Sequence, residues 1–193
     1  FSKKFKGKIN FKINEIISEN DPLFDFTGIG QIKSGKINKL TAKANFSDAG
    51  ILEISITPIN SNKKKLFIYS DKAKPFVSGF KFIKGFSEGK LEYISDYDNK
   101  MSKSNLKIYD FKVKDVPALA KLLSLASLQG VADLLTGEGI RFSEFEMDFE
   151  TEEKTITINE LYAIGPAISI LMSGYVEKDQ LVSLRGTLVP ATT

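Results

Sequence analysis

The sequence predicts a mainly β fold of about ten short strands with one helical insertion. Over most of the chain, apolar and polar residues alternate with a period of two, which is the pattern of strands with one dry face and one wet face. Clusters of Gly, Pro, Asn, Asp and Ser separate these stretches at short intervals, as turns between strands do. One long run near residues 116–135 is instead nearly uncharged and has helical spacing.

The first 68 residues are expected to form repeated amphipathic strands. Residues 4–13 place Phe5, Ile9 and Phe11 on one side and lysines on the other. Strands of the same kind are predicted at residues 23–33, 36–46, 51–57 and 66–70. The chain begins at Phe1, already in this pattern, which predicts that residues 1–193 are one β-rich domain cut from a longer protein.

Residues 71–82 interrupt the alternation, and we expect a second short helix near residues 72–82. A strand at residues 106–113 follows, with Ile108 on one side and Phe111 on the other. A strand that is apolar on both faces is typical of a position covered from both sides.

The helical insertion near residues 116–135 has marked ends. Asp115 can cap its first turn, and Pro117 fits there because the missing N–H costs nothing. Gly137 and Gly139 suit its C-terminal end. The run is apolar around most of its surface, so we expect it to pack against the sheet as a covering helix rather than to cross a membrane.

Ten apolar residues of the last four strands are predicted to share one face of the sheet. They alternate with polar residues, among them an acidic row on the strand near residues 144–150 that we expect to face solvent. The candidate site residues are Phe145, Met147, Phe149, Ile156, Ile158, Ile168, Ile170, Met172, Val182 and Leu184.

Two arrangements would remove so much apolar strand surface from water. The sheet can close on itself as a sandwich or barrel, or it can bend into a trough filled by something apolar. The residue pattern alone favours closure, because only two short helical segments are available as covers.

No catalytic chemistry is predicted. The chain has no Cys and no His, which excludes thiolate nucleophiles, a Ser-His-Asp triad and the usual zinc ligands within it. We therefore expect no enzyme, no cofactor and no metal site. The net charge of +3, with acidic and basic residues interspersed, does not favour nucleic acid as a partner.

Residues 69–193 resemble the C-terminal region of the AsmA-like family of bacterial envelope proteins, the AsmA, TamB and YhdP type. The resemblance is carried by DFKVKDVPALAKLLSLASLQG at residues 110–130 and LLTGEGIRF at residues 134–142. GPA at 165–167, GYV at 174–176 and LRGTLVPA at 184–191 complete the set.

The resemblance implies an extended, curved antiparallel sheet, groove-like or taco-like, whose apolar side contacts phospholipid acyl chains. It implies a periplasmic location, with the parent protein tethered to the inner membrane by a part outside these residues. The implied role is phospholipid transport between inner and outer membrane in support of outer-membrane integrity. The alternative is a closed β-sandwich that docks onto an envelope protein partner through the Leu-rich helix or the loop at residues 63–65.

Overall fold

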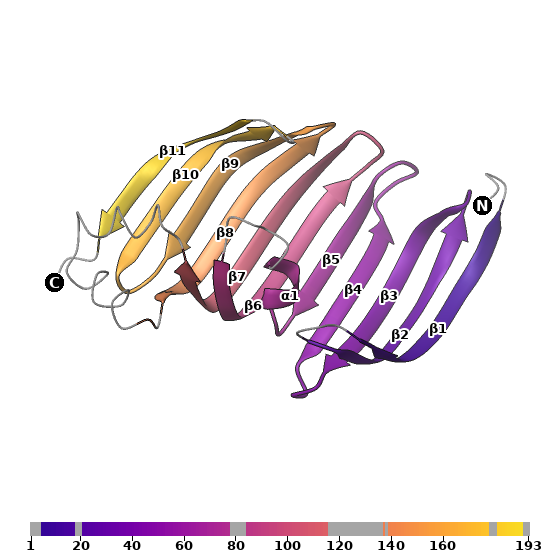
Figure 1. Cartoon of the computed structure of the whole chain (residues 1–193). Helices are drawn as coiled ribbons and strands as arrows, with labels where there is room; N and C mark the ends of the chain where they lie inside the picture. The colour runs from indigo at the N-terminus through magenta and orange to yellow at the C-terminus, as the bar shows by residue number, and fades with distance from the viewer. Residues whose placement is uncertain are drawn as a thin grey trace.

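The computed structural model describes residues 5–17, 21–77, 84–115, 137, 139–177 and 181–190. In these residues it is a single antiparallel sheet of eleven strands, arranged in the order of the sequence (Figure 1). The strands are β1 (Lys6–Ile16), β2 (Leu23–Lys33), β3 (Lys36–Phe46), β4 (Ile51–Pro58), β5 (Lys64–Ser70), β6 (Lys84–Tyr97), β7 (Met101–Asp115), β8 (Ile140–Glu152), β9 (Thr155–Ile164), β10 (Ile168–Glu177) and β11 (Leu181–Pro190).

Each strand pairs with its sequence neighbours, so the connections alternate between two ends of the sheet. We call the end with the β2–β3, β4–β5, β6–β7, β8–β9 and β10–β11 connections the tip end. The opposite end, which includes the β5–β6 connection with the short helix α1 (Lys74–Val77), is the base end. In Figure 1 the tip end is uppermost, and α1 lies in front of β6 in the lower half.

The sheet is open, with β1 and β11 as its two edges. The extended antiparallel sheet is therefore confirmed, and the closed sandwich or barrel favoured by the residue pattern is wrong. Consecutive strands pair along the whole meander, so among the described residues no long connection carries the chain back to lay a second sheet over the first. The second short helix is confirmed at residues 74–77, whereas the insertion near residues 116–135 lies outside the described residues.

Aligned irregularities in β6 and β7 change which side chains face the core. Glu88 has a φ of 63° and Asp110 a φ of 53°, in the left-handed region that interrupts strand alternation. As a result Phe111 faces the same way as Ile108, and both are buried in one cluster. The prediction that β7 is apolar on both faces, with Ile108 and Phe111 opposed, is therefore wrong.

The core lies at the base end, between the sheet and α1. Ala73, just before α1, and Val77, the last residue of α1, are buried against residues of β6, β7, β8 and β10. Phe86, Phe111 and Phe142 form an aromatic ladder across three neighbouring strands, with ring centroids 5.2 and 5.3 Å apart and nearly parallel planes. Each such pair adds about 0.5–1.5 kcal/mol beyond the area that it buries.

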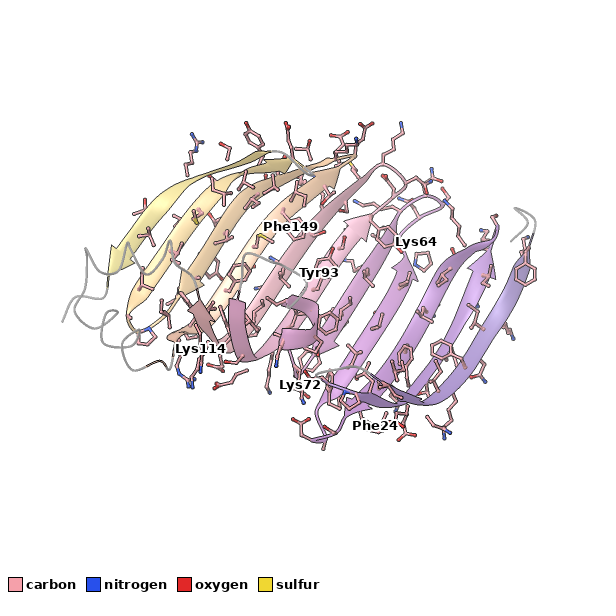
Figure 2. The ribbon with its side chains drawn as sticks, viewed as in Figure 1. Phe24, Lys64, Lys72, Tyr93, Lys114 and Phe149 are labelled. Carbon is pink, nitrogen blue, oxygen red and sulfur yellow. The ribbon has the colours of Figure 1, made fainter. Side chains whose placement is uncertain are left out.

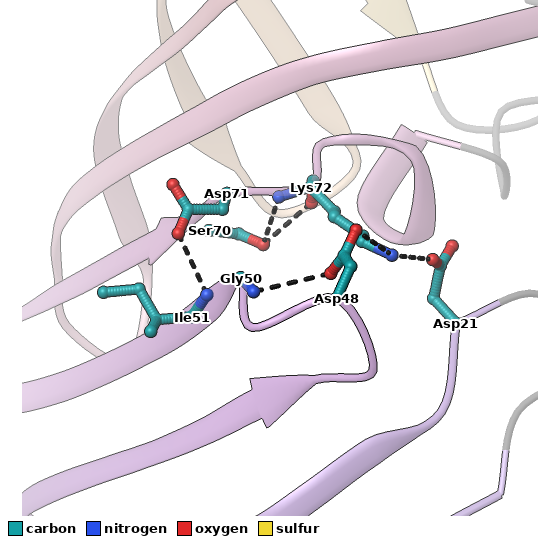
Figure 3. A network of polar contacts seen from close by, with 7 residues as sticks. All are labelled: Asp21, Asp48, Gly50, Ile51, Ser70, Asp71 and Lys72. Atoms are coloured by element: carbon teal, nitrogen blue, oxygen red, sulfur yellow. Dashed lines mark hydrogen bonds and ion pairs between the residues drawn. The ribbon is translucent and has the colours of Figure 1, made fainter.

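A polar network holds the connection that carries α1. The ammonium of Lys72 lies 2.8 Å from a carboxylate oxygen of Asp21 and 3.1 Å from one of Asp48 (Figure 3). Asp71, next to it, accepts a hydrogen bond of 2.9 Å from the backbone N–H of Ile51. Three base-end connections are thus joined, which fixes α1 over the sheet.

Candidate functional site

One face of the sheet, the side that packs against α1, is apolar across all eleven strands. We call it the apolar face. Cross-strand pairing aligns its side chains in rows that run perpendicular to the strands. The middle row contains Ile54, Ile68, Tyr93, Leu106, Met147, Leu161 and Met172. The next row toward the tip contains Ile56, Leu66, Ser95, Ser104, Phe149, Ile158 and Gly174.

The apolar face is covered at its base end and only half-buried at many of its other positions. At the base end Ile140, Phe142 and Ile168 are almost fully buried. Tyr93 and Met147 of the middle row are only half-buried. Among the described residues, the half-buried side chains of the middle row leave apolar surface accessible, whereas Ser95, Ser104 and Ile158 of the next row toward the tip are buried. Accessible apolar surface of this kind marks sites for apolar ligands or partners.

All ten predicted site residues lie on the apolar face, because the register aligns the four strands that carry them. Their exposure differs. Ile168 is 2% exposed and Ile158 is also buried, so these two side chains offer almost no surface to a ligand. Val182 and Leu184, on the edge strand β11, are 64% and 40% exposed. The other six are half-buried, a state that leaves apolar atoms available to a ligand.

A hydroxyl cluster interrupts the apolar face near its centre. The Ser104 hydroxyl donates to the Ser95 Oγ at 2.9 Å, and the Tyr93 hydroxyl lies 3.1 Å from the Ser104 Oγ. Because these groups bond to one another, the buried serines are not left unpaired. Figure 2 shows Tyr93 and Phe149 over the middle of the sheet, and their rings stack with centroids 6.4 Å apart.

A hollow of about 450 Å³ opens beside this cluster at the tip end. Leu66, Tyr93, Ser95 and Tyr97 are among its lining residues, and the β6–β7 turn and Glu153 complete it. Its volume is in the range of small-molecule sites. Burial raises the pKa of the Tyr97 phenol above its ordinary value.

The opposite face carries a lattice of charged and polar groups. Lys103 pairs with Glu150 at 2.9 Å and Lys107 with Glu146 at 3.1 Å. Asn105 donates to Glu146 as well, at 2.6 Å. Burial acts to raise the pKa of Glu146, but hydrogen bonds from Tyr162, Asn105 and Lys107 outweigh it and lower that pKa. The acidic row of β8 is thus held by cross-strand partners.

The sequence prediction missed the hydroxyl cluster and the hollow. Ser95 and Ser104 are small polar residues of the kind that alternation assigns to solvent, and neither carries a motif. They meet only because the β6–β7 register sets Ser95 opposite Ser104. A scan for polar residues at apolar-side positions, two residues after Tyr93 and two before Leu106, would have found them.

No protein-family model, curated protein or solved structure matches this chain. The resemblance to AsmA-like proteins therefore stays a prediction. Among the described residues, no helix has the length and hydropathy needed to cross a membrane, and no group of three or more acidic side chains could hold a metal ion.

Proposed function

We propose that this domain binds phospholipid acyl chains on its apolar face and passes them along the sheet, as part of an AsmA-like protein of the bacterial envelope. The observation that supports the proposal most strongly is the middle row of the apolar face, in which Tyr93, Leu106 and Met147 are only half-buried. A face that only filled a core would be covered along its whole length.

The rows match the dimensions of lipid chains. Eleven strands at a spacing of about 4.8 Å give rows on the order of 50 Å long, whereas one leaflet contributes about half of a 30 Å hydrocarbon core. More than one chain therefore fits along a row. Each methylene that leaves water for the apolar face contributes about 0.8 kcal/mol, and neighbouring positions offer similar contacts.

The mechanism that we propose is passive. The middle row contains mostly Ile, Leu and Met side chains of similar hydrophobicity, so a chain that lies along this row gains similar free energy at neighbouring positions and shifts without a large barrier. The charged lattice on the opposite face keeps the sheet hydrated. The proposal uses no catalytic group, cofactor or metal. It places the domain in the periplasm, tethered to the inner membrane by another part of the parent protein.

Native mass spectrometry of the domain after expression in a Gram-negative periplasm tests the proposal. We expect co-purified phospholipid with the wild-type domain, and little or none with Met147→Lys or Ile170→Glu, because a charge on a middle or neighbouring row must be desolvated by the chain. Asp148→Lys, on the opposite face, serves as the matched control and should retain the lipid. A wild-type domain that emerges without lipid and takes up no fluorescent fatty acid would contradict the proposal.

A second candidate function is docking onto an envelope protein, and the edge strand β11 favours it. Val182, Leu184 and Val189 are exposed on its two faces, whereas the other edge strand, β1, has a row of lysines on its polar side. Charged residues on an edge discourage strand addition, so β11 is the edge better suited to pair with a partner's strand. Empty protein in the native mass spectra would shift attention to this function.

A further inference from the structure

The β3–β4 pair opens into a fork at the tip end. Pairing between the two strands stops at Leu40 and Ile56, and β4 ends at Pro58, which has no N–H to donate. Lys36, Ile37 and Lys39 of β3 therefore pair with β2 but have no ladder partner on β4. The ammonium of Lys64 enters this fork and donates to the backbone carbonyl of Ile37.

A second lysine reaches across the same place. The ammonium of Lys36, at the start of β3, donates to the Asn99 side-chain oxygen at 2.9 Å, and Asn99 belongs to the β6–β7 turn. In a flat sheet three strand spacings, about 14 Å, separate β3 from β6. The contact therefore requires the tip end to twist and curl, and it brings the fork next to the hollow, which Asn99 also lines.

The two ammonium groups have neutral partners. Within the part of the chain that the structure describes, neither Lys36 nor Lys64 has a carboxylate within 4.0 Å. Lys65, one residue further along, differs because it points to the opposite face and pairs with Asp96 at 3.4 Å. Burial and the nearby charge of Lys36 lower the pKa of Lys64, so the two cations repel each other at a partly dry position.

The nearest acidic side chain of the turn does not neutralise this pair. The Asp98 carboxylate accepts hydrogen bonds from the backbone N–H groups of Lys100, at 2.7 Å, and Met101, at 3.1 Å. It caps its own turn. Lys64 of β5 lies directly opposite Tyr97 of the neighbouring strand β6, and Tyr97 lines the hollow. Lys36 and Lys64 thus lie beside the hollow at the tip end, where Figure 2 labels Lys64, and the charged residues that line the hollow itself are Asp98, Lys100 and Glu153.

We propose that Lys36 and Lys64, with Asn99 beside them, bind the phosphate of a phospholipid headgroup whose acyl chains lie on the apolar face. This inference rests on the proposed lipid-binding function and adds to it the residues that hold the phosphate of the headgroup. A phosphate oxygen accepts charge-assisted hydrogen bonds from both ammonium groups and relieves their repulsion. The hollow beside Tyr97 has room for the glycerol part of the headgroup, and the chains continue toward Phe149.

Equilibrium binding of two fluorescent lipids tests the site. Phosphatidylglycerol and diacylglycerol with the same chains and the same label differ only in the phosphate headgroup. We expect the wild-type domain to prefer phosphatidylglycerol, and K36Q/K64Q to lose about tenfold in affinity for it with unchanged affinity for diacylglycerol. K65Q, on the opposite face, should change neither value. The single variant K36Q leaves the Lys64 bond in the fork intact, and we expect it to show part of the loss.

Each result has a distinct meaning. Equal affinity of the wild-type domain for both lipids, or an equal loss for both lipids in K36Q/K64Q, would overturn the headgroup site and leave the proposed function standing. Binding of neither lipid by the wild-type domain would overturn both. Glycerol phosphate that displaces phosphatidylglycerol at equal concentration would show that the site takes a soluble phosphate, and this too would overturn the lipid assignment.

Discussion

Phe111 is the residue on which the core depends most. It is 5% exposed, it stacks on Phe86 and Phe142, and it meets Phe145 edge-on with centroids 6.5 Å apart. Phe111 thereby connects the buried base-end cluster to Phe145, which lies in the row next to the middle row. Period-two alternation assigned Phe111 to the wrong face, because the left-handed conformation of Asp110 is a local backbone feature that hydrophobic pattern does not encode.

We expect Phe111→Ala to lower the free energy of unfolding by about 3–5 kcal/mol, because it leaves a cavity in the ladder. Urea denaturation followed by circular dichroism would measure the change. Ile29→Ala is the control, since Ile29 is 64% exposed on the opposite face and its loss should stay within about 0.5 kcal/mol. Similar losses for the two variants would show that the ladder is not the core.

Asp71 should make stability depend on acid pH. Hydrogen bonds from the Ile51 N–H and the Tyr69 hydroxyl, aided by the charge of Lys90, hold the Asp71 pKa below its ordinary value of 3.8. The unfolded chain therefore binds a proton more readily than the folded one, so this contribution is complete above the ordinary pKa and is lost as pH falls through the folded value. Asp71→Asn should flatten the decline in unfolding free energy below about pH 5. If the unfolding free energy of Asp71→Asn declined with falling pH as steeply as that of the wild-type domain, this prediction would be contradicted.

At the scale of elements, the strands were largely predictable and their irregularities were not. The predicted strand at residues 36–46 matches β3, and the side assigned to Ala42, Ala44 and Phe46 is buried. Alternation works there because one face is dry and the other wet along the whole strand. The bulges of β6 and β7, the fork beside Pro58 and the hydroxyl cluster depend on how neighbouring strands pair, and one strand's sequence does not state its register.

The left-handed conformation of Asp110 gives an element-scale prediction. Asp110→Gly should leave stability unchanged or raise it by up to about 1 kcal/mol, because glycine adopts this conformation without strain. Asp110→Val should cost about 1–2 kcal/mol, since a β-branched residue resists it. Thermal denaturation of both variants would measure these effects. Lys103→Val, at a regular position of β7, is the control and should cost little. A tolerated valine at 110 would show that β7 runs without the bulge.

At the scale of the whole molecule, composition predicted the fold class but not its closure. Excess apolar strand surface is compatible with a sandwich and with an open sheet, because both are built from strands that have one apolar face. The outcome depends on connectivity, and here each strand pairs with its sequence neighbours, which yields one open layer. The candidate site was predictable as a set of ten residues on one face. Ile168 is covered because it belongs to the base-end cluster, whereas Ile158 is buried in the row toward the tip. Sequence periodicity does not distinguish these two residues from the other eight.

Site-specific photo-crosslinking in a Gram-negative periplasm tests directly whether phospholipid contacts the apolar face. A photoreactive residue would replace each position from 144 to 149 of β8 in turn, and crosslinked phospholipid would be detected by mass spectrometry. We expect crosslinks at Phe145, Met147 and Phe149 and none at the intervening acidic positions. Crosslinks of equal yield at all six positions, or at none, would contradict this expectation.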